Sequence, residues 1–284
     1  MFYDLSVPYD KDASALGSRL HILKKLGYQC VALNTVVSGK SFATKAVIPK
    51  PIPIDGSGDV SASLAMWTSH HQGELPALAQ LTRLTICVDD SIQNQHLNGN
   101  QSLLNSFDLI AIQPMTEKAF QAACGTFDID IITLDFSCRL PFFIKATTVN
   151  LAIQRGVHFE ISVGTALRDS SSRRHLINNA VSLIRASRGK NIILSGEAFR
   201  ELDIRAPYDI MNLASIFGLN MTQAKESITK NGREVLLHAA TRKDTFKGII
   251  SSELTDALQS TESAWKGGLN DDFISFADID MEDE

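Results

Sequence analysis

Short apolar segments alternate with helix-like segments along most of this 284-residue chain, and no other feature restricts its fold as strongly. Most of these segments are apolar at every position rather than at every second one, which is typical of parallel strands covered on both faces. We predict eight strands, at 2–7, 29–33, 84–88, 109–113, 129–134, 158–163, 191–194 and 234–237.

Helix-like segments separate the predicted strands. Four of them end near a glycine, a residue that readily adopts the left-handed conformation after a last helical turn. These four cover 13–26, 116–123, 148–155 and 169–188, and a further pair covers 208–217 and 222–230. We therefore predict an α/β fold, a TIM-barrel-like (β/α) barrel, over residues 1–243, although a doubly wound open sheet would give the same order of elements.

Two segments depart from the alternation. Residues 35–80 hold four of the eight prolines, so we expect a long insertion in the second connection between strand and helix. Residues 244–284 carry 11 acidic residues against 2 basic ones, and we expect a disordered acidic tail.

The cysteines and the apolar segments bear on the compartment. The four cysteines form no C-x-x-C pair, and no basic leader precedes an apolar stretch at the N-terminus, so we expect a reducing intracellular environment. Apolar windows stay below the roughly 18 residues that a membrane span needs, so we expect no membrane contact.

Charge is segregated along the chain. The formal charge is −4 for residues 1–135, +8 for 136–243 and −9 for 244–284. A basic block in a chain of acidic pI indicates a local face that binds a polyanion, although solvated helix faces remain an alternative.

Most cations of the basic block follow a predicted strand, which would place them on the C-terminal rim of a closed barrel. The candidate RNA-binding residues are Arg139, Lys145, Arg168, Arg173, Arg174, Arg205, Arg242 and Lys243.

The start of the predicted helix 169–188 is unusual, because Arg173 and Arg174 oppose the helix dipole there. Asp169 or a following serine can cap this helix. A phosphate at the helix start would remove the conflict. Pairing of both arginines with carboxylates such as Glu160 or Asp135 is the alternative.

Carboxylates at the predicted strand ends raise a second hypothesis. Asp4, Asp135, Glu160 and His238 could serve a metal-dependent phosphoesterase. Histidine is scarce, however, and of the seven in the chain only His238 falls at a predicted strand end. A third hypothesis is a protein-interaction module without RNA contact, which the acidic tail would suit.

Several longer strings identify a family. The strings 1–8, 113–120, 134–143, 168–174 and 235–243 resemble the barrel-type protein subunit, of about thirty kilodaltons, of eukaryotic nuclear RNase P and RNase MRP. Cys138 departs from the pattern, which would place a second basic residue beside Arg139.

The resemblance implies a TIM-barrel-like fold related to metal-dependent phosphoesterases of the polymerase and histidinol phosphatase class. Those enzymes carry a His-x-His pair after the first strand, where this chain reads Asp4-Leu5-Ser6, so no catalytic residue or metal site is carried over. It further implies a non-catalytic subunit that binds the catalytic RNA, precursor tRNA and a small ferredoxin-like protein in the nucleus and nucleolus. Magnesium is expected on the RNA, and no cofactor on this chain.

Overall fold

The computed structural model describes residues 1–38, 46–54, 78–89, 100–164 and 169–244. The expected acidic tail, Arg168 and most of the expected insertion at 35–80 lie outside these residues. Within the described part of the chain, no helix is long and apolar enough to cross a membrane.

Seven parallel strands form one sheet, and each pairs with the next in chain order. They are β1 (Tyr3–Pro8), β2 (Cys30–Ser38), β3 (Ala79–Val88), β4 (Leu109–Pro114), β5 (Ile131–Thr133), β6 (His158–Ser162) and β7 (Ile192–Ser195). The first and last strands approach each other, and the Gly196 N–H after β7 donates to the Asp4 carboxylate of β1 over 3.1 Å. The sheet is therefore a nearly closed barrel, and the predicted α/β barrel is confirmed.

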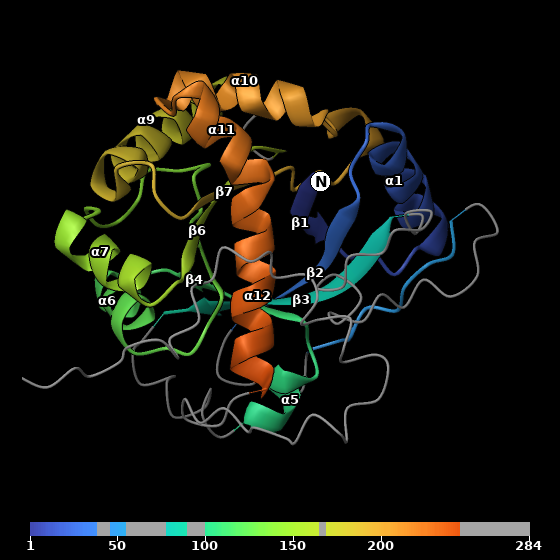
Figure 1. Cartoon of the computed structure of the whole chain (residues 1–284), viewed down its shortest axis with the longest axis horizontal. Coiled ribbons are helices and arrows are strands. Elements are labelled where there is room, and N and C mark those ends of the chain that lie inside the picture. The colour runs from blue at the N-terminus through green and yellow to red at the C-terminus, as the bar shows by residue number, and fades with distance from the viewer. Residues whose placement is uncertain (39–45, 55–77, 90–99, 165–168, 245–284) are drawn as a thin grey trace, which may run out of the picture.

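Helices surround these strands (Figure 1). They are α1 (Ala13–Lys25), α5 (Gln101–Asn105), α6 (Glu117–Gly125), α7 (Ala146–Gln154), α9 (Ser170–Ser187), α10 (Pro207–Phe217), α11 (Met221–Ile228) and α12 (Lys230–Asp244), with a 3-10 turn, η2 (Glu201–Asp203). The prediction missed α5. Asp169 caps α9 as expected, because its carboxylate accepts from the Ser172 N–H.

The predicted eighth strand at 234–237 is wrong, because these residues lie within helix α12. Val235, Leu236 and Ala239 are buried, whereas Leu237 is 39% exposed, which matches the face of a helix. A short apolar run cannot be distinguished from one turn of a buried helix by its hydrophobicity alone.

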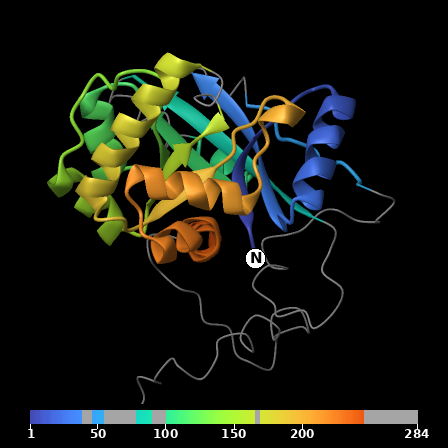
Figure 2. The same cartoon turned by 90° about the horizontal axis from the view of Figure 1, so that it is seen from above.

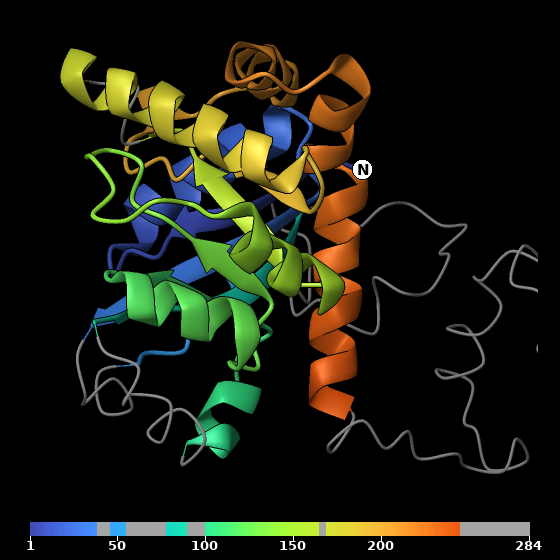
Figure 3. The same ribbon diagram turned by 90° about the vertical axis from the view of Figure 1, so that its left-hand side faces the viewer.

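Helix α12 crosses the end of the barrel at which the strands begin. The Asn231 side chain donates to the Ile192 carbonyl at the start of β7, and His238 bonds to Asp130, which precedes β5. Figure 2 looks nearly along α12, and Figure 3 shows it running across the end from which the strands start.

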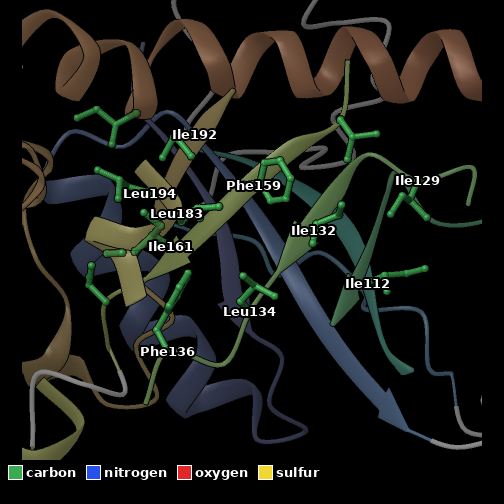
Figure 4. Packing of buried hydrophobic residues seen from close by; sticks show 14 of the residues in the cluster. Ile112, Ile129, Ile132, Leu134, Phe136, Phe159, Ile161, Leu183, Ile192 and Leu194 are labelled. Carbon is green, nitrogen blue, oxygen red and sulfur yellow. The ribbon is translucent and has the colours of Figure 1, made fainter. Parts of the chain in front are cut away.

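Two buried clusters make up the core. The larger lies mainly between the strands and the outer helices and includes Ile132, Phe159, Ile161 and Leu183 (Figure 4). The smaller is formed by inner residues of the strands, such as Leu5 and Ile193, against Val235 of α12. The inner cluster explains how seven strands enclose a core without an eighth.

The limits of the expected insertion also change. Strand β2 continues to Ser38, and β3 already begins at Ala79. The two strands form one long parallel ladder that runs from the pair Cys30 and Ala79 to the pair Ser38 and Cys87. Residues 35–38 and 79–80 therefore belong to strands rather than to a loop.

Candidate functional site

A cavity of about 230 Å³ opens at the end of the barrel where the strands finish. Polar side chains dominate its lining. They include Asn34, Arg83, Thr85, Gln113, Asp135, Ser162 and Glu197, contributed by strands β2 to β6 and the segments that follow β5 and β7. The mouth of the barrel is therefore a polar site rather than an apolar ligand pocket.

A buried ion pair forms the inner part of this site. Arg83 of β3 donates from its two terminal nitrogens to the two carboxylate oxygens of Glu160 on β6, at 2.6 and 2.5 Å. Both side chains are 0% exposed. Arg83 also donates to the Leu5 carbonyl of β1, so a single guanidinium connects three strands across the barrel.

Neutral polar side chains extend from the pair. The Arg83 Nε donates to the Thr85 hydroxyl at 3.2 Å, and that hydroxyl donates to the Asn34 amide oxygen at 2.7 Å. The Asn34 amide then donates to the Ser6 hydroxyl at 3.3 Å. Ser195 donates to Glu160 from β7. The network satisfies the buried charges, as stable burial requires.

Two further carboxyl groups have raised pKa values. Burial, reinforced by the charge of Glu160, raises the pKa of Asp4 to about 6, although N–H groups of Gly196 and Ser6 oppose this shift. Burial and the same charge raise the pKa of Glu197 to about 7. Both carboxyl groups therefore hold a proton more readily than an exposed carboxyl does, chiefly because burial disfavours their charged form.

The backbone positions Glu197 in a strained conformation. Its φ angle is 45°, which is rare for a residue with a side chain. Neighbouring Gly164 permits this arrangement, because a Cβ there would lie 2.2 Å from the Gly196 carbonyl. Such strain is found most often at functional sites.

The proposed phosphoesterase set is not brought together. Asp4, Asp135 and Glu160 belong to the mouth side of the barrel, but His238 lies on α12 at the opposite end. No group of three or more potential metal-binding side chains occurs within the described residues. The prediction that His238 ends a strand is therefore wrong.

The structure supports the rim position of some predicted RNA-binding residues. Arg139 and Lys145 follow β5 and are exposed, and Lys145 pairs with Glu117 at 2.7 Å. Arg173 and Arg174 are exposed in the first turn of α9. Arg205 follows η2 and donates to the carbonyls of Leu202 and Ile204.

At the start of α9 the structure shows the expected cap, while a phosphate held by Arg173 and Arg174 stays a prediction. The Asp169 carboxylate already occupies the start of α9, because it accepts from the Ser172 N–H and from the hydroxyls of Ser171 and Ser172. These bonds lower the pKa of Asp169. The chain thus supplies its own anion there. Glu160 does not pair with these arginines, since Arg83 holds it.

Arg242 and Lys243 are not on the rim, and their predicted placement is wrong. Arg242 is 8% exposed and donates to Asp130 at 3.1 Å, while Lys243 lies 3.1 Å from Asp108. Both carboxylates precede strands, at the end of the barrel covered by α12. The error follows from the wrongly predicted eighth strand. After a strand these two residues would lie at the mouth, but they belong to the last turn of α12, which stays at the opposite end of the barrel.

Sequence reasoning missed Arg83 and Glu197. Arg83 had a signal, because it interrupts the apolar positions Leu81, Leu84 and Ile86, and a charge in a buried strand needs a partner. Glu197 had none, since only the path of the chain after β7 directs it into the cavity.

Comparisons with known proteins agree with this geometry. Residues 1–244 match the family model described as RNase P subunit p30. A mouse protein, "Ribonuclease P protein subunit p30", is 39% identical over 88% of this chain and 90% of its own length. A Schizosaccharomyces pombe protein, "Probable ribonuclease P protein subunit 3", is 35% identical over 88% of this chain and 99% of its own length.

A solved structure shares the fold. It comes from a "cryo-EM structure of archaeal Ribonuclease P with mature tRNA", with a TM-score of 0.61 and 15% identity. The similarity covers 88% of this chain and 97% of that one. At this identity it supports the barrel architecture alone.

Proposed function

Because the chain belongs to the RNase P subunit p30 family, we propose that it is a non-catalytic, RNA-binding subunit of the RNase P and RNase MRP ribonucleoproteins. It supports maturation of the 5′ end of precursor tRNA, and processing of rRNA, by stabilising the catalytic RNA and helping to form the substrate site. Its partners are that RNA, precursor tRNA and a small ferredoxin-like protein subunit. The chain works in the nucleus and nucleolus, with magnesium held by the RNA.

The Arg83–Glu160 pair is the observation that carries the non-catalytic part of this proposal. The pair uses both oxygens of the best buried carboxylate at the mouth and places a guanidinium beside Asp4 and Glu197. Because Arg83 binds both oxygens of Glu160, this carboxylate is already engaged and is a poor ligand for a divalent cation. This arrangement favours a structural core over a metal centre.

Exposed cations at the mouth support RNA binding. Arg139, Arg173 and Arg174 lie on the loop after β5 and on the first turn of α9. The loop contacts the middle of α9, because the Asn179 side chain donates to the Cys138 carbonyl at 2.8 Å. Neighbouring guanidiniums on one surface suit the phosphates of an RNA backbone, which position a protein without reading sequence.

The salt dependence of RNA binding tests this surface. We expect Arg173→Ala with Arg174→Ala to weaken binding of the full-length chain to RNase P RNA and to reduce the slope of log K against log salt by about 2, one for each phosphate contact. Arg185→Ala with Arg233→Ala is the matched control, because it removes two exposed arginines from the end of α9 remote from the mouth and from α12. Equal slopes for the two double variants would contradict the proposal.

A phosphoesterase is the second candidate, favoured by the carboxylates of the mouth. Full-length protein without RNA, given magnesium, manganese or zinc and a phosphoester substrate, is expected to show no turnover. Reproducible turnover that Asp135→Asn abolishes would refute the non-catalytic assignment.

A further inference from the structure

Phe143 is an aromatic side chain that the fold leaves almost wholly in solvent. Its exposure is 83%, while the preceding Phe142 is 7% exposed. Both lie on the loop of residues 134–145 that connects β5 to α7 at the mouth of the barrel. Adjacent phenylalanines with opposite environments show that the loop turns one ring inward and the other outward.

Contacts along the loop hold it in this conformation. The Phe142 ring stacks on Phe120 of α6, with centroids 5.0 Å apart and planes inclined at 26°. Upstream, the Asp135 carboxylate accepts from the Ser137 N–H at 2.9 Å, and the Cys138 carbonyl accepts from Asn179 at 2.8 Å. Because these contacts fix the loop as far as Phe142, Phe143 is presented in a defined place at little further entropic cost.

The charges beside Phe143 indicate what it contacts. Arg139 precedes it by four residues and Lys145 follows by two, and both are exposed. The segment 139–145 contains no acidic residue. Lys145 pairs with Glu117, but an exposed pair of this kind is weak and can exchange for a phosphate.

Other exposed apolar side chains at this end have different neighbours. Leu202 is 89% exposed and Phe199 is 53% exposed, and an acid, Glu201, lies between them beside Arg200. A protruding ring on a segment that carries a cation on each side of it and no acidic residue matches the pattern of stacking surfaces for single-stranded nucleic acid, although Lys145 also meets Glu117 of α6.

We propose that Phe143 stacks on an unpaired nucleobase of the RNA while Arg139 and Lys145 hold the adjoining phosphates. The inference rests on the proposed RNA-binding function and adds a base contact to it. Every base has a π face, so the contact selects unpaired nucleotides rather than a sequence.

Binding of RNase P RNA by the full-length chain tests the stack. We expect Phe143→Ala to weaken binding by about 5- to 150-fold, the range for loss of one base–aromatic stack. The salt slope should stay at its wild-type value, because no charge is removed. Phe143→Trp should retain affinity, and its added fluorescence should be quenched by RNA.

Phe143→Leu distinguishes stacking from apolar docking, because it keeps an apolar side chain and removes the ring. We expect it to behave like the alanine variant, and wild-type affinity in Phe143→Leu would overturn the stack in favour of apolar docking, such as against a protein. Leu202→Ala is the control for loss of an exposed apolar residue. Unchanged RNA binding by Phe143→Ala would contradict the stacking inference alone. A wild-type chain that does not bind RNA would contradict the proposed function as well.

Discussion

Arg83 reaches into the barrel from β3, and its charge is paired with that of Glu160, which lies 77 residues further along the chain. The exposed fraction of both side chains is zero. Removal of one partner would leave the other charge buried without compensation, which costs more than the pair itself contributes. The stability of the barrel interior thus depends on the contact between Arg83 and Glu160 rather than on either residue alone.

A pair of variants tests this dependence. We expect Arg83→Met to lower the free energy of unfolding by about 3–5 kcal/mol, and Arg83→Met with Glu160→Leu to lower it less, because no buried charge remains. Urea denaturation of the two variants and the wild type measures the difference. A double variant as unstable as Arg83→Met would show that packing, not charge, sets the cost.

Glu197 makes stability depend on pH. Its pKa rises from 4.5 to about 7 on folding, so between these values the folded protein holds a proton that the unfolded chain has released. Since the folded state binds more protons in this range, the free energy of unfolding falls as pH rises from 4.5 to about 7 and then levels.

Glu197→Gln should remove the part of this fall in the free energy of unfolding that comes from Glu197. We expect the variant to exceed the wild type in stability at about pH 8 by on the order of 1–2 kcal/mol, and by less at about pH 5. Urea midpoints at the two pH values provide the measurement. Glu117→Gln is the control, because Lys145 lowers the pKa of that exposed carboxyl and no gain at high pH is expected. A parallel pH profile for wild type and Glu197→Gln would count against the argument.

At the scale of elements, the residues expected to form an eighth strand belong to α12, which covers the end of the barrel at which the strands begin. Its apolar face packs on the side chains of the strands that point into the barrel, and its polar side chains pair with Asp108 and Asp130. Gly232 lets the helix approach β1 closely, because a Cβ at this position would lie 2.8 Å from Cγ of Tyr3.

Two glycine substitutions separate helix propensity from packing. We expect Gly17→Ala in α1 to raise the free energy of unfolding by about 0.5–1 kcal/mol, since the added methyl has no neighbour within 4 Å. Gly232→Ala should lower it by about 1–3 kcal/mol, because overpacking against Tyr3 outweighs the gain in propensity. Thermal or urea unfolding compares them. A stabilised Gly232→Ala would mean that α12 does not press on β1.

For the molecule as a whole, the two ends of the barrel have different roles. The mouth carries a polar cavity, exposed arginines and the projecting Phe143, whereas the other end is covered by α12 and its ion pairs. At the mouth, exposed cations and a projecting aromatic ring lie on one loop. The proposed salt-slope and stacking experiments both address that end.

The sequence alone determined seven of the strands, six of the helices around them and the family, because hydrophobic periodicity and helix-ending signals are local properties of the chain. It also placed Arg139 and Lys145 after β5, since βα order decides which loops meet at the mouth. Tertiary structure alone decided that residues 234–237 lie in a helix across one end of the barrel rather than in a strand, that Arg83 meets Glu160, and that Arg242 lies away from the mouth. These three features depend on contacts between residues far apart in the chain, which no local pattern encodes.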